Sequence, residues 1–166
     1  MAGRLELRDK QGRGFTLRPL GPGDRTELET MYEVFEPKRV AQGLPPDAAD
    51  QRARWLDSIL SDGLHLLVEI DGAICGHGML LPFSPDAAEL ANFLHQSIRD
   101  RGIGTALNRA LVQAGRERGL RRIWLSVEPS NQRAIRSYEK VGFRRLPATP
   151  WAPEIEMDFA IGSAPD

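Results

Sequence analysis

Apolar residues follow two different spacings along the chain, and the spacing changes from segment to segment. Four segments repeat apolar residues every three to four positions, which is typical of amphipathic helices, whereas the others alternate or form the short apolar runs typical of strands. The helices are expected to begin near Asp24, Asp47, Thr105 and Asn131. The strands are expected over residues 15–19, 65–70, 73–81, 88–94, 122–127, 143–146 and 154–159.

Turn and capping residues mark several of the boundaries. Asp24, with Glu27 three positions later, has the pattern of a capping box, which opens a helix. The pair Asp71-Gly72 between two apolar runs is typical of a two-residue hairpin turn, so the flanking strands should be antiparallel. Pro82 is expected to end the second of these strands, because proline has no N–H group to donate to a neighbouring strand.

Composition narrows the class of protein. The 166 residues have the usual size of one compact domain, and 41% hydrophobic with 27% charged residues is ordinary for a globular protein, so we expect a single domain over residues 1–166. A net charge of −1 offers no basic excess for neutralising phosphates, so nucleic acid is not an expected partner. The sequence has no apolar run near the ~20 residues of a membrane span and its first residues lack the apolar core of a secretion signal. We therefore expect a cytoplasmic location and no membrane partner.

The residue types that most often carry a nucleophile or a metal are few. Cys75 is the only cysteine, so it has no disulfide partner in the chain, and no neighbouring cationic cluster lowers its pKa. A buried strand position is favoured for it over a role in a two-step acyl transfer. His65, His77 and His95 lack the paired spacing of metal ligands, and no metal is expected.

A glycine-containing loop, residues 99–105 (Arg-Asp-Arg-Gly-Ile-Gly-Thr), lies between a predicted strand and a predicted helix. Free N–H groups and the positive end of the helix dipole make such a position an anion site, to which the two arginines could add charge. A P-loop is excluded because no Gly-Lys-Ser/Thr follows, and a dinucleotide fingerprint is excluded because Leu107 replaces its third glycine. By itself the loop fits a phosphate site or an ordinary turn.

Two motifs resemble those of one family. Arg99-x-x-Gly102-x-Gly104 is similar to the pyrophosphate-binding signature of the GNAT superfamily of N-acetyltransferases. Residues 123–131 together with 134–143 resemble the family's second motif, a strand followed by a helix. The resemblance covers nearly the whole chain, in the family's order. It implies a mixed α/β, GNAT-like fold with a central, mostly antiparallel sheet of six to seven strands flanked by four helices, and acetyl-CoA as cosubstrate.

The resemblance also implies which residues hold the cofactor. The end of the strand before the loop would line the pantetheine arm and the loop would hold the pyrophosphate, with a backbone N–H near the strand end as oxyanion donor. The helix-capping asparagine of the second motif would add a hydrogen bond to the cofactor while keeping its capping role. The implied residues are Asn92, Phe93, Leu94, Arg99, Asp100, Arg101, Gly102, Ile103, Gly104, Thr105 and Asn131.

Transfer of an acyl group from a thioester to an amine needs a neutral amine and a proton for the departing thiolate. The phenol of Tyr138 stays protonated at neutral pH, and the resemblance places the corresponding tyrosine near the CoA sulfur, although packing against the core is the alternative role. Some family members carry a glutamate as base where this chain has Ser126. Glu89 is then the candidate base, with a surface strand glutamate as the alternative.

The function implied is transfer of an acetyl group from acetyl-CoA to a primary amine of a small molecule or peptide, by direct attack in a ternary complex. The rival functions are a non-catalytic acyl-CoA-binding or regulatory module and an interaction domain that uses the loop as a turn. In the family, the first two helices often form a wall of the acceptor site, which makes Tyr32, Arg39 and Trp55 candidate acceptor contacts by position. The sequence does not decide whether the protein is a monomer or a homodimer.

Overall fold

The computed structural model describes residues 3–38 and 44–162, and this part contains one eight-stranded sheet with the order β1-β2-β3-β4-β5-β6-β8-β7. Neighbouring strands are antiparallel except β5 and β6, which are parallel. The strands are Leu5–Arg8 (β1), Gly14–Pro19 (β2), Leu64–Ile70 (β3), Ala73–Ser84 (β4), Ala87–Leu94 (β5), Arg122–Val127 (β6), Arg144–Arg145 (β7) and Ile155–Ala160 (β8). The expected mixed α/β, mostly antiparallel fold is confirmed.

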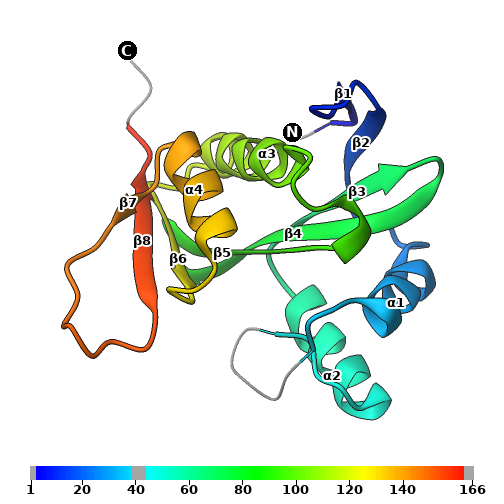
Figure 1. Ribbon diagram of the computed structural model, residues 1–166, viewed down its shortest axis with the longest axis horizontal. Helices are drawn as coiled ribbons and strands as arrows, with labels where there is room; N and C mark the ends of the chain where they lie inside the picture. Colours follow the sequence, from blue (N-terminus) through cyan, green and yellow to red (C-terminus); the bar gives the residue numbers. More distant parts are fainter. Residues whose placement is uncertain (1–2, 39–43, 163–166) are drawn as a thin grey trace.

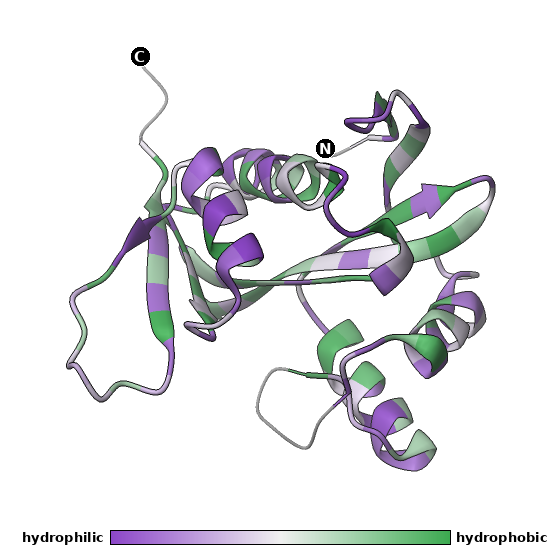
Figure 2. Ribbon diagram, in the orientation of Figure 1, coloured by the Kyte–Doolittle hydropathy of each residue, from purple (hydrophilic) through white to green (hydrophobic). Residues whose placement is uncertain are grey.

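Four helices cover the two faces of the sheet, α1 and α2 on one face and α3 and α4 on the other (Figure 1). They are Arg25–Val34 (α1), Ala49–Leu60 (α2), Ile103–Glu117 (α3) and Gln132–Val141 (α4), with a short 3₁₀ turn at Gln96–Ile98 (η1). Hydrophilic and hydrophobic residues alternate along their turns, as in amphipathic helices (Figure 2).

The sheet separates two hydrophobic clusters because successive strand residues point to opposite faces. In β3, Leu66 and Val68 belong to the cluster under α3 and α4, whereas Leu67 between them belongs to the cluster under α1 and α2. In β4, Leu80 joins the first cluster and Met79 the second. This two-sided burial explains why β3 and β4 are almost continuously apolar in sequence.

Two strand predictions differ from the structure. The edge strand β1 was not predicted, because it is only four residues long and all four are exposed, although apolar and polar positions alternate in it. Pro82 does not end β4, which continues to Ser84 with a register shift between these two residues. A bulge of this kind accommodates the missing proline N–H. The hairpin turn is confirmed, since Asp71 and Gly72 both have positive φ, 51° and 80°.

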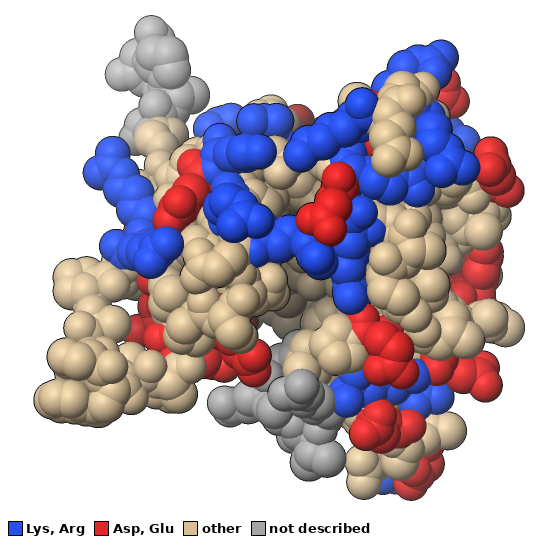
Figure 3. Space-filling view, in the orientation of Figure 1, with Lys and Arg blue, Asp and Glu red and all other residues tan. Residues whose placement is uncertain are grey.

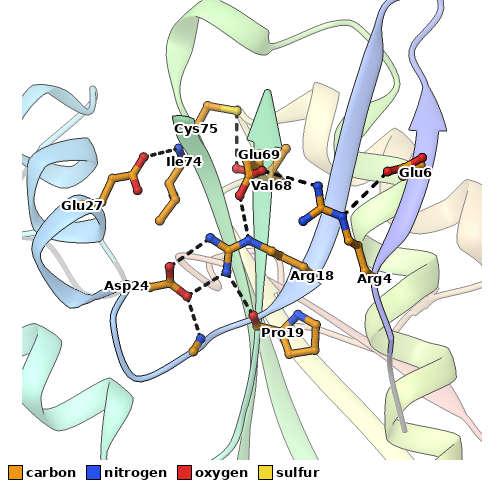
Figure 4. Close-up of polar contacts among 11 residues, drawn as sticks. Arg4, Glu6, Arg18, Pro19, Asp24, Glu27, Val68, Glu69, Ile74 and Cys75 are labelled. Atoms are coloured by element: carbon orange, nitrogen blue, oxygen red, sulfur yellow. Dashed lines mark hydrogen bonds and ion pairs between the residues drawn. The ribbon is translucent and has the colours of Figure 1, made fainter. Parts of the chain in front are cut away.

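The capping box predicted for α1 is wrong. Asp24 precedes the helix but makes no side-chain capping hydrogen bond, because its carboxylate accepts hydrogen bonds from the Arg18 guanidinium at 2.8 and 2.9 Å and from the Gly21 amide at 2.7 Å. Arg18 also donates to Glu69 on β3 at 2.7 Å, and Glu27 accepts from the main chain of β4 (Figure 4). These side chains fasten α1 to the sheet instead of closing its first turn.

The parallel strands β5 and β6 pair over only a short distance. Their register covers residues 87–89 of β5 with 122–124 of β6, and the remaining residues of both strands have no partner in each other. The sheet therefore splits between the end of β5 and the end of β6. The loops that lead to α3 and α4 lie at this split (Figure 1).

Candidate active site

A cavity of about 610 Å³ lies where β5 and β6 separate. Figure 3 shows the hollow near the centre of the view, with Lys and Arg side chains gathered over α3 and α4 on one side of it. Its walls contain most of the residues that sequence analysis assigned to the site. These are Glu89, Asn92, Phe93, Leu94, Arg99, Asp100, Gly102, Gly104, Thr105, Asn131 and Tyr138.

The start of α3 has the features of an anion cradle. Gly102 is the N-cap with φ 81°, a conformation that favours glycine, and no side chain caps the helix. The N–H groups of the first turn are therefore left for a ligand. At Gly104 a Cβ atom would lie 3.2 Å from Cδ1 of Leu94, so the missing side chain keeps the loop close to the end of β5.

Arg99 connects the end of β5 to the segment after α1. Its Nε donates to the Leu94 carbonyl at 3.1 Å, its Nη2 donates to the Glu36 carbonyl, and its guanidinium lies 5.4 Å from the centroid of the Phe35 ring. Burial and the nearby Arg133 lower the pKa of Arg99, which nevertheless stays charged. The residue thus orders the cavity wall in addition to contributing positive charge.

Two residues of the loop do not line the cavity. Arg101 turns away and forms a buried ion pair with Asp9, with Nε 2.6 Å from Oδ2, and Ile103 is fully buried in the core. Arg101 was expected to add charge to a phosphate site, but the carboxylate of Asp9, remote in sequence, pairs with it instead. Only the main chain of these two residues remains available to a ligand.

Tyr138 lies on α4, where it both packs against the core and faces the cavity. Its ring is buried in the core, 5.8 Å from the ring of Phe143, and it also lines the cavity. Burial raises the pKa of Tyr138 to about 12, partly offset by a hydrogen bond with Asn92. The phenol is therefore protonated at neutral pH and available as a hydrogen-bond donor.

A chain of side-chain hydrogen bonds runs along the cavity wall and was not inferred from the sequence. Asn92 donates to Asn108 at 2.5 Å, Asn108 donates to Ser137 at 3.1 Å, and Ser137 is 2.9 Å from the Thr105 hydroxyl. Asn108 is almost fully buried. A polar residue inside the apolar stripe of α3 was the signal that could have revealed it. The chain fixes β5, α3 and α4 relative to one another around Tyr138.

Carboxylates also line the cavity. Glu89 is half-buried on β5, and burial together with the neighbouring Glu154 raises its pKa. Glu128 and Glu154 line the same cavity, as does Ser126, where the family resemblance implies a glutamate base in some members. Glu89 is thus neither fully solvated nor remote from the site, which distinguishes it from an ordinary surface glutamate.

Two of the three residues expected to contact the acceptor, Tyr32 and Trp55, are not among the described residues that line the cavity. Tyr32 is fully buried and its hydroxyl lies 2.7 Å from Nδ1 of His77, so it is not available for direct contact with an acceptor. Trp55 packs edge-on against Tyr32 and does not line the cavity, whereas Phe35 does. Arg39 lies outside the described residues.

The surroundings of Cys75, His65 and His77 do not suit a nucleophile or a metal site. Burial raises the pKa of the Cys75 thiol to about 11, which suits a strand residue better than a nucleophile. His65 and His77, twelve positions apart, lie 2.9 Å apart between Nδ1 and Nε2, but residues 3–38 and 44–162 contain no group of three or more possible metal ligands. Across the described parts of the chain, no helix is long and apolar enough to cross a membrane.

The sequence was compared with models of known protein families. Residues 28–143 match the model described as the acetyltransferase (GNAT) family, which includes both motifs and most of the cavity wall. The chain belongs to the GNAT acetyltransferase family. The resemblance inferred from the two motifs is therefore confirmed.

Curated relatives are acetyltransferases of several kinds. The chain is 32% identical to a mycothiol acetyltransferase of Salinispora tropica, over 81% of this chain and 46% of the relative. It is 27% identical to an L-methionine sulfoximine/L-methionine sulfone acetyltransferase of Pseudomonas aeruginosa, over 77% of this chain and 79% of the relative. It is 35% identical to an uncharacterised N-acetyltransferase of Mycobacterium bovis, over 45% of this chain and 48% of the relative. The chain thus spans about half the length of the Salinispora and Mycobacterium relatives.

Solved structures share the fold at low sequence identity. The GNAT domain of PAT from S. lividans superposes with a TM-score of 0.78 at 21% identity, covering 95% of this chain and 97% of that one. A phosphinothricin acetyltransferase from Sinorhizobium meliloti, solved in complex with AcCoA, gives 0.71 at 19% identity, with 89% of each chain covered. These likenesses confirm the GNAT-like fold that the motifs implied.

Proposed function

We propose that this acetyltransferase moves the acetyl group of acetyl-CoA to a primary amine of a small molecule or peptide, by direct attack in a ternary complex. The observation that carries the proposal is the continuity of one cavity from the uncapped start of α3 to Tyr138 and Glu89. An anion cradle, a phenol and carboxylates in one cavity match the diphosphate and thioester of the cosubstrate and a cationic acceptor.

The cosubstrate proposal depends on the shape and chemistry of the loop. The amides of residues 102–105 would bind the diphosphate, and the edge of β5 from Asn92 to Leu94 would bind the pantetheine arm, with Asn131 as a further hydrogen-bonding group. Relatives of the same fold were solved with acetyl-CoA, which supports this cosubstrate. The residues present fit it, because the loop has no side chain over the helix N-terminus.

The main chain at the end of β5 provides a candidate oxyanion donor. His95 donates its N–H to the Cys75 carbonyl at 2.9 Å, and Leu94 is opposite Gly76 in the same antiparallel ladder. Hydrogen-bonded and non-hydrogen-bonded pairs alternate in such a ladder, so the N–H of Leu94 points away from β4, toward the split with β6. We assign to this amide the stabilisation of the tetrahedral oxyanion.

Two side chains have proton-transfer roles in the proposal. Glu89 takes a proton from the acceptor ammonium, and its raised pKa brings the carboxylate closer to a base suited to neutral pH. Tyr138 donates a proton to the thiolate as the carbon–sulfur bond breaks, and the second proton that the nitrogen loses as the amide forms is returned through solvent to Tyr138. A single domain over residues 1–166 and a cytoplasmic location stay predictions.

The decisive experiment is a panel of amines incubated with acetyl-CoA, with release of free thiol as the signal. We expect turnover with at least one small amine, since two of the relatives are named for small-molecule acceptors. A non-catalytic acyl-CoA-binding module would bind CoA and release no thiol with any amine. An interaction domain would show no thermal shift with CoA, whereas a ligand at a hundred times its Kd stabilises by about 2.7 kcal/mol.

A further inference from the structure

The turn between β1 and β2, residues 9–13, lies against the glycine loop although the two are about ninety residues apart in sequence. The Lys10 amide donates to the Arg101 carbonyl at 2.9 Å. The Lys10 side chain also lines the cavity beside Gly102. An N-terminal segment outside both family motifs therefore contributes to the wall of the proposed diphosphate site.

A buried ion pair holds this turn in place. The Asp9 carboxylate accepts hydrogen bonds from the amides of Gln11 and Arg13 at 2.8 and 3.0 Å and from Nε of Arg101 at 2.6 Å. Although burial raises the pKa of Asp9, these hydrogen bonds outweigh it and hold the pKa below its ordinary value. The carboxylate stays ionised and fixes both the shape of the turn and its position on the loop.

The Lys10 side chain runs across the face of Gly102. A Cβ atom at Gly102 would lie 3.2 Å from Cγ, 3.4 Å from Cε and 3.7 Å from Cδ of Lys10, so the absent side chain leaves room for this close approach. The ammonium is one bond beyond Cε, next to the uncapped start of α3. Within residues 3–38 and 44–162 the Lys10 side chain has no ion-pair or hydrogen-bond partner.

Other cations of the loop region already have partners. Arg99 donates to two main-chain carbonyls, Arg101 is paired with the buried carboxylate of the turn, and Arg133 pairs with Asp100 at 2.6 Å. Among the described residues the Lys10 side chain has no such partner, and it lies against Gly102 of the same loop. Its position suits an anion that occupies the helix N-terminus, where an added ammonium strengthens binding.

We propose that Lys10 binds the diphosphate of the acyl-CoA cosubstrate and that Asp9, through its ion pair with Arg101, holds Lys10 in position. The inference rests on the proposed function, since it needs an acyl-CoA in the cavity. The diphosphate is assigned rather than the 3′-phosphate because the ammonium lies beside Gly102, at the helix start that would hold the diphosphate.

The test compares wild type with Lys10→Met in equilibrium binding of acetyl-CoA, its 3′-dephospho analogue and S-acetylpantetheine, which lacks phosphate. We expect the Kd to rise about tenfold for acetyl-CoA and by the same factor for the dephospho analogue, as for loss of one charge-assisted contact. The Kd for S-acetylpantetheine should not change. Lys10→Arg should bind nearly as wild type does, and Arg13→Met, on the same turn but outside the cavity wall, is the matched control.

An unchanged Kd for acetyl-CoA in Lys10→Met would overturn the inference and leave the proposed function intact. A loss confined to acetyl-CoA, with the dephospho analogue unaffected, would move Lys10 to the 3′-phosphate and also overturn it. Wild-type protein that binds none of the three ligands would contradict the proposed function itself. The unfolding midpoint of Lys10→Met should match that of wild type, because its side chain is exposed.

The positioning role of Asp9 has its own readout. Asp9→Asn should weaken acetyl-CoA binding in the wild-type background but add little to the effect of Lys10→Met, because both changes remove the same contact. Equal weakening in both backgrounds would mean that Asp9 acts only on the structure of the loop, and it would overturn the positioning role.

Discussion

Protonation of His77 should destabilise the fold at acid pH. The Asp62 carbonyl can only accept, so Nε2 of His65, 2.8 Å away, carries a proton and Nδ1 of His65 accepts from His77. Nδ1 of His77 then accepts from the Tyr32 hydroxyl at 2.7 Å. Every nitrogen of the two neutral rings has one suitable partner, and an added proton on either ring breaks the chain.

The magnitude follows from the pKa of His77. Burial, with a smaller contribution from His65, lowers this pKa to about 3, whereas an unfolded histidine titrates near 6.5. The unfolded state therefore binds more protons between these two values, and stability is lost as the pH falls from about 6.5 toward 3. At pH 4.5 the cost is about 2.7 kcal/mol, from two pH units at about 1.36 kcal/mol each.

The assay is urea unfolding followed by tryptophan fluorescence at pH 7.5 and 4.5. Protonation of His77 should lower the free energy of unfolding of wild type by about 2.7 kcal/mol between pH 7.5 and 4.5. His77→Gln keeps a hydrogen-bond acceptor and a donor, so its free energy of unfolding should fall by about 2.7 kcal/mol less than that of wild type. His95→Gln removes a histidine from the exposed turn before α3 and is the control. If His77→Gln and wild type lose the same free energy on acidification, the reasoning is refuted.

Two further predictions concern the cavity. The negative charge of Glu154 raises the pKa of Glu89, so Glu154→Gln should shift the acidic limb of the pH profile of kcat/KM to lower pH. An unshifted limb would exclude Glu89 as the titrating base. Glu156→Gln is the control. Gly104→Ala places a Cβ atom 3.2 Å from Cδ1 of Leu94, and Gly104→Val adds two more methyl groups at this contact. CoA affinity measured by calorimetry should therefore fall more than about tenfold in Gly104→Val and much less in Gly104→Ala. Equal affinities for the two variants would show that the loop relaxes freely.

The sequence was most informative where local chemistry and packing agree. The helix stripes, the Asp71-Gly72 turn and the Asn131 cap, whose side chain accepts from the Ala134 amide at 3.3 Å, all appear in the structure. Each depends on residues close together in the chain. The β5–loop–α3 unit was found for the same reason.

The features that were missed depend on contacts between distant segments. Asp24 has the sequence of a cap, but Arg18 takes its carboxylate; Arg101 has the charge of a phosphate ligand, but Asp9 pairs with it. Neither competition is visible in local spacing. The buried Asn108 and the approach of Lys10 to Gly102 likewise arise only when the sheet brings separate elements together.

The central claim is that Tyr138 donates the proton to the leaving thiolate in a cavity that binds acetyl-CoA. The most direct measurement is kcat with the best amine acceptor, alongside the Kd for acetyl-CoA, in wild type and Tyr138→Phe. We expect the kcat of Tyr138→Phe to be lower by about a hundredfold or more, within the range for loss of a general acid, with the Kd nearly unchanged. An unchanged kcat would contradict it.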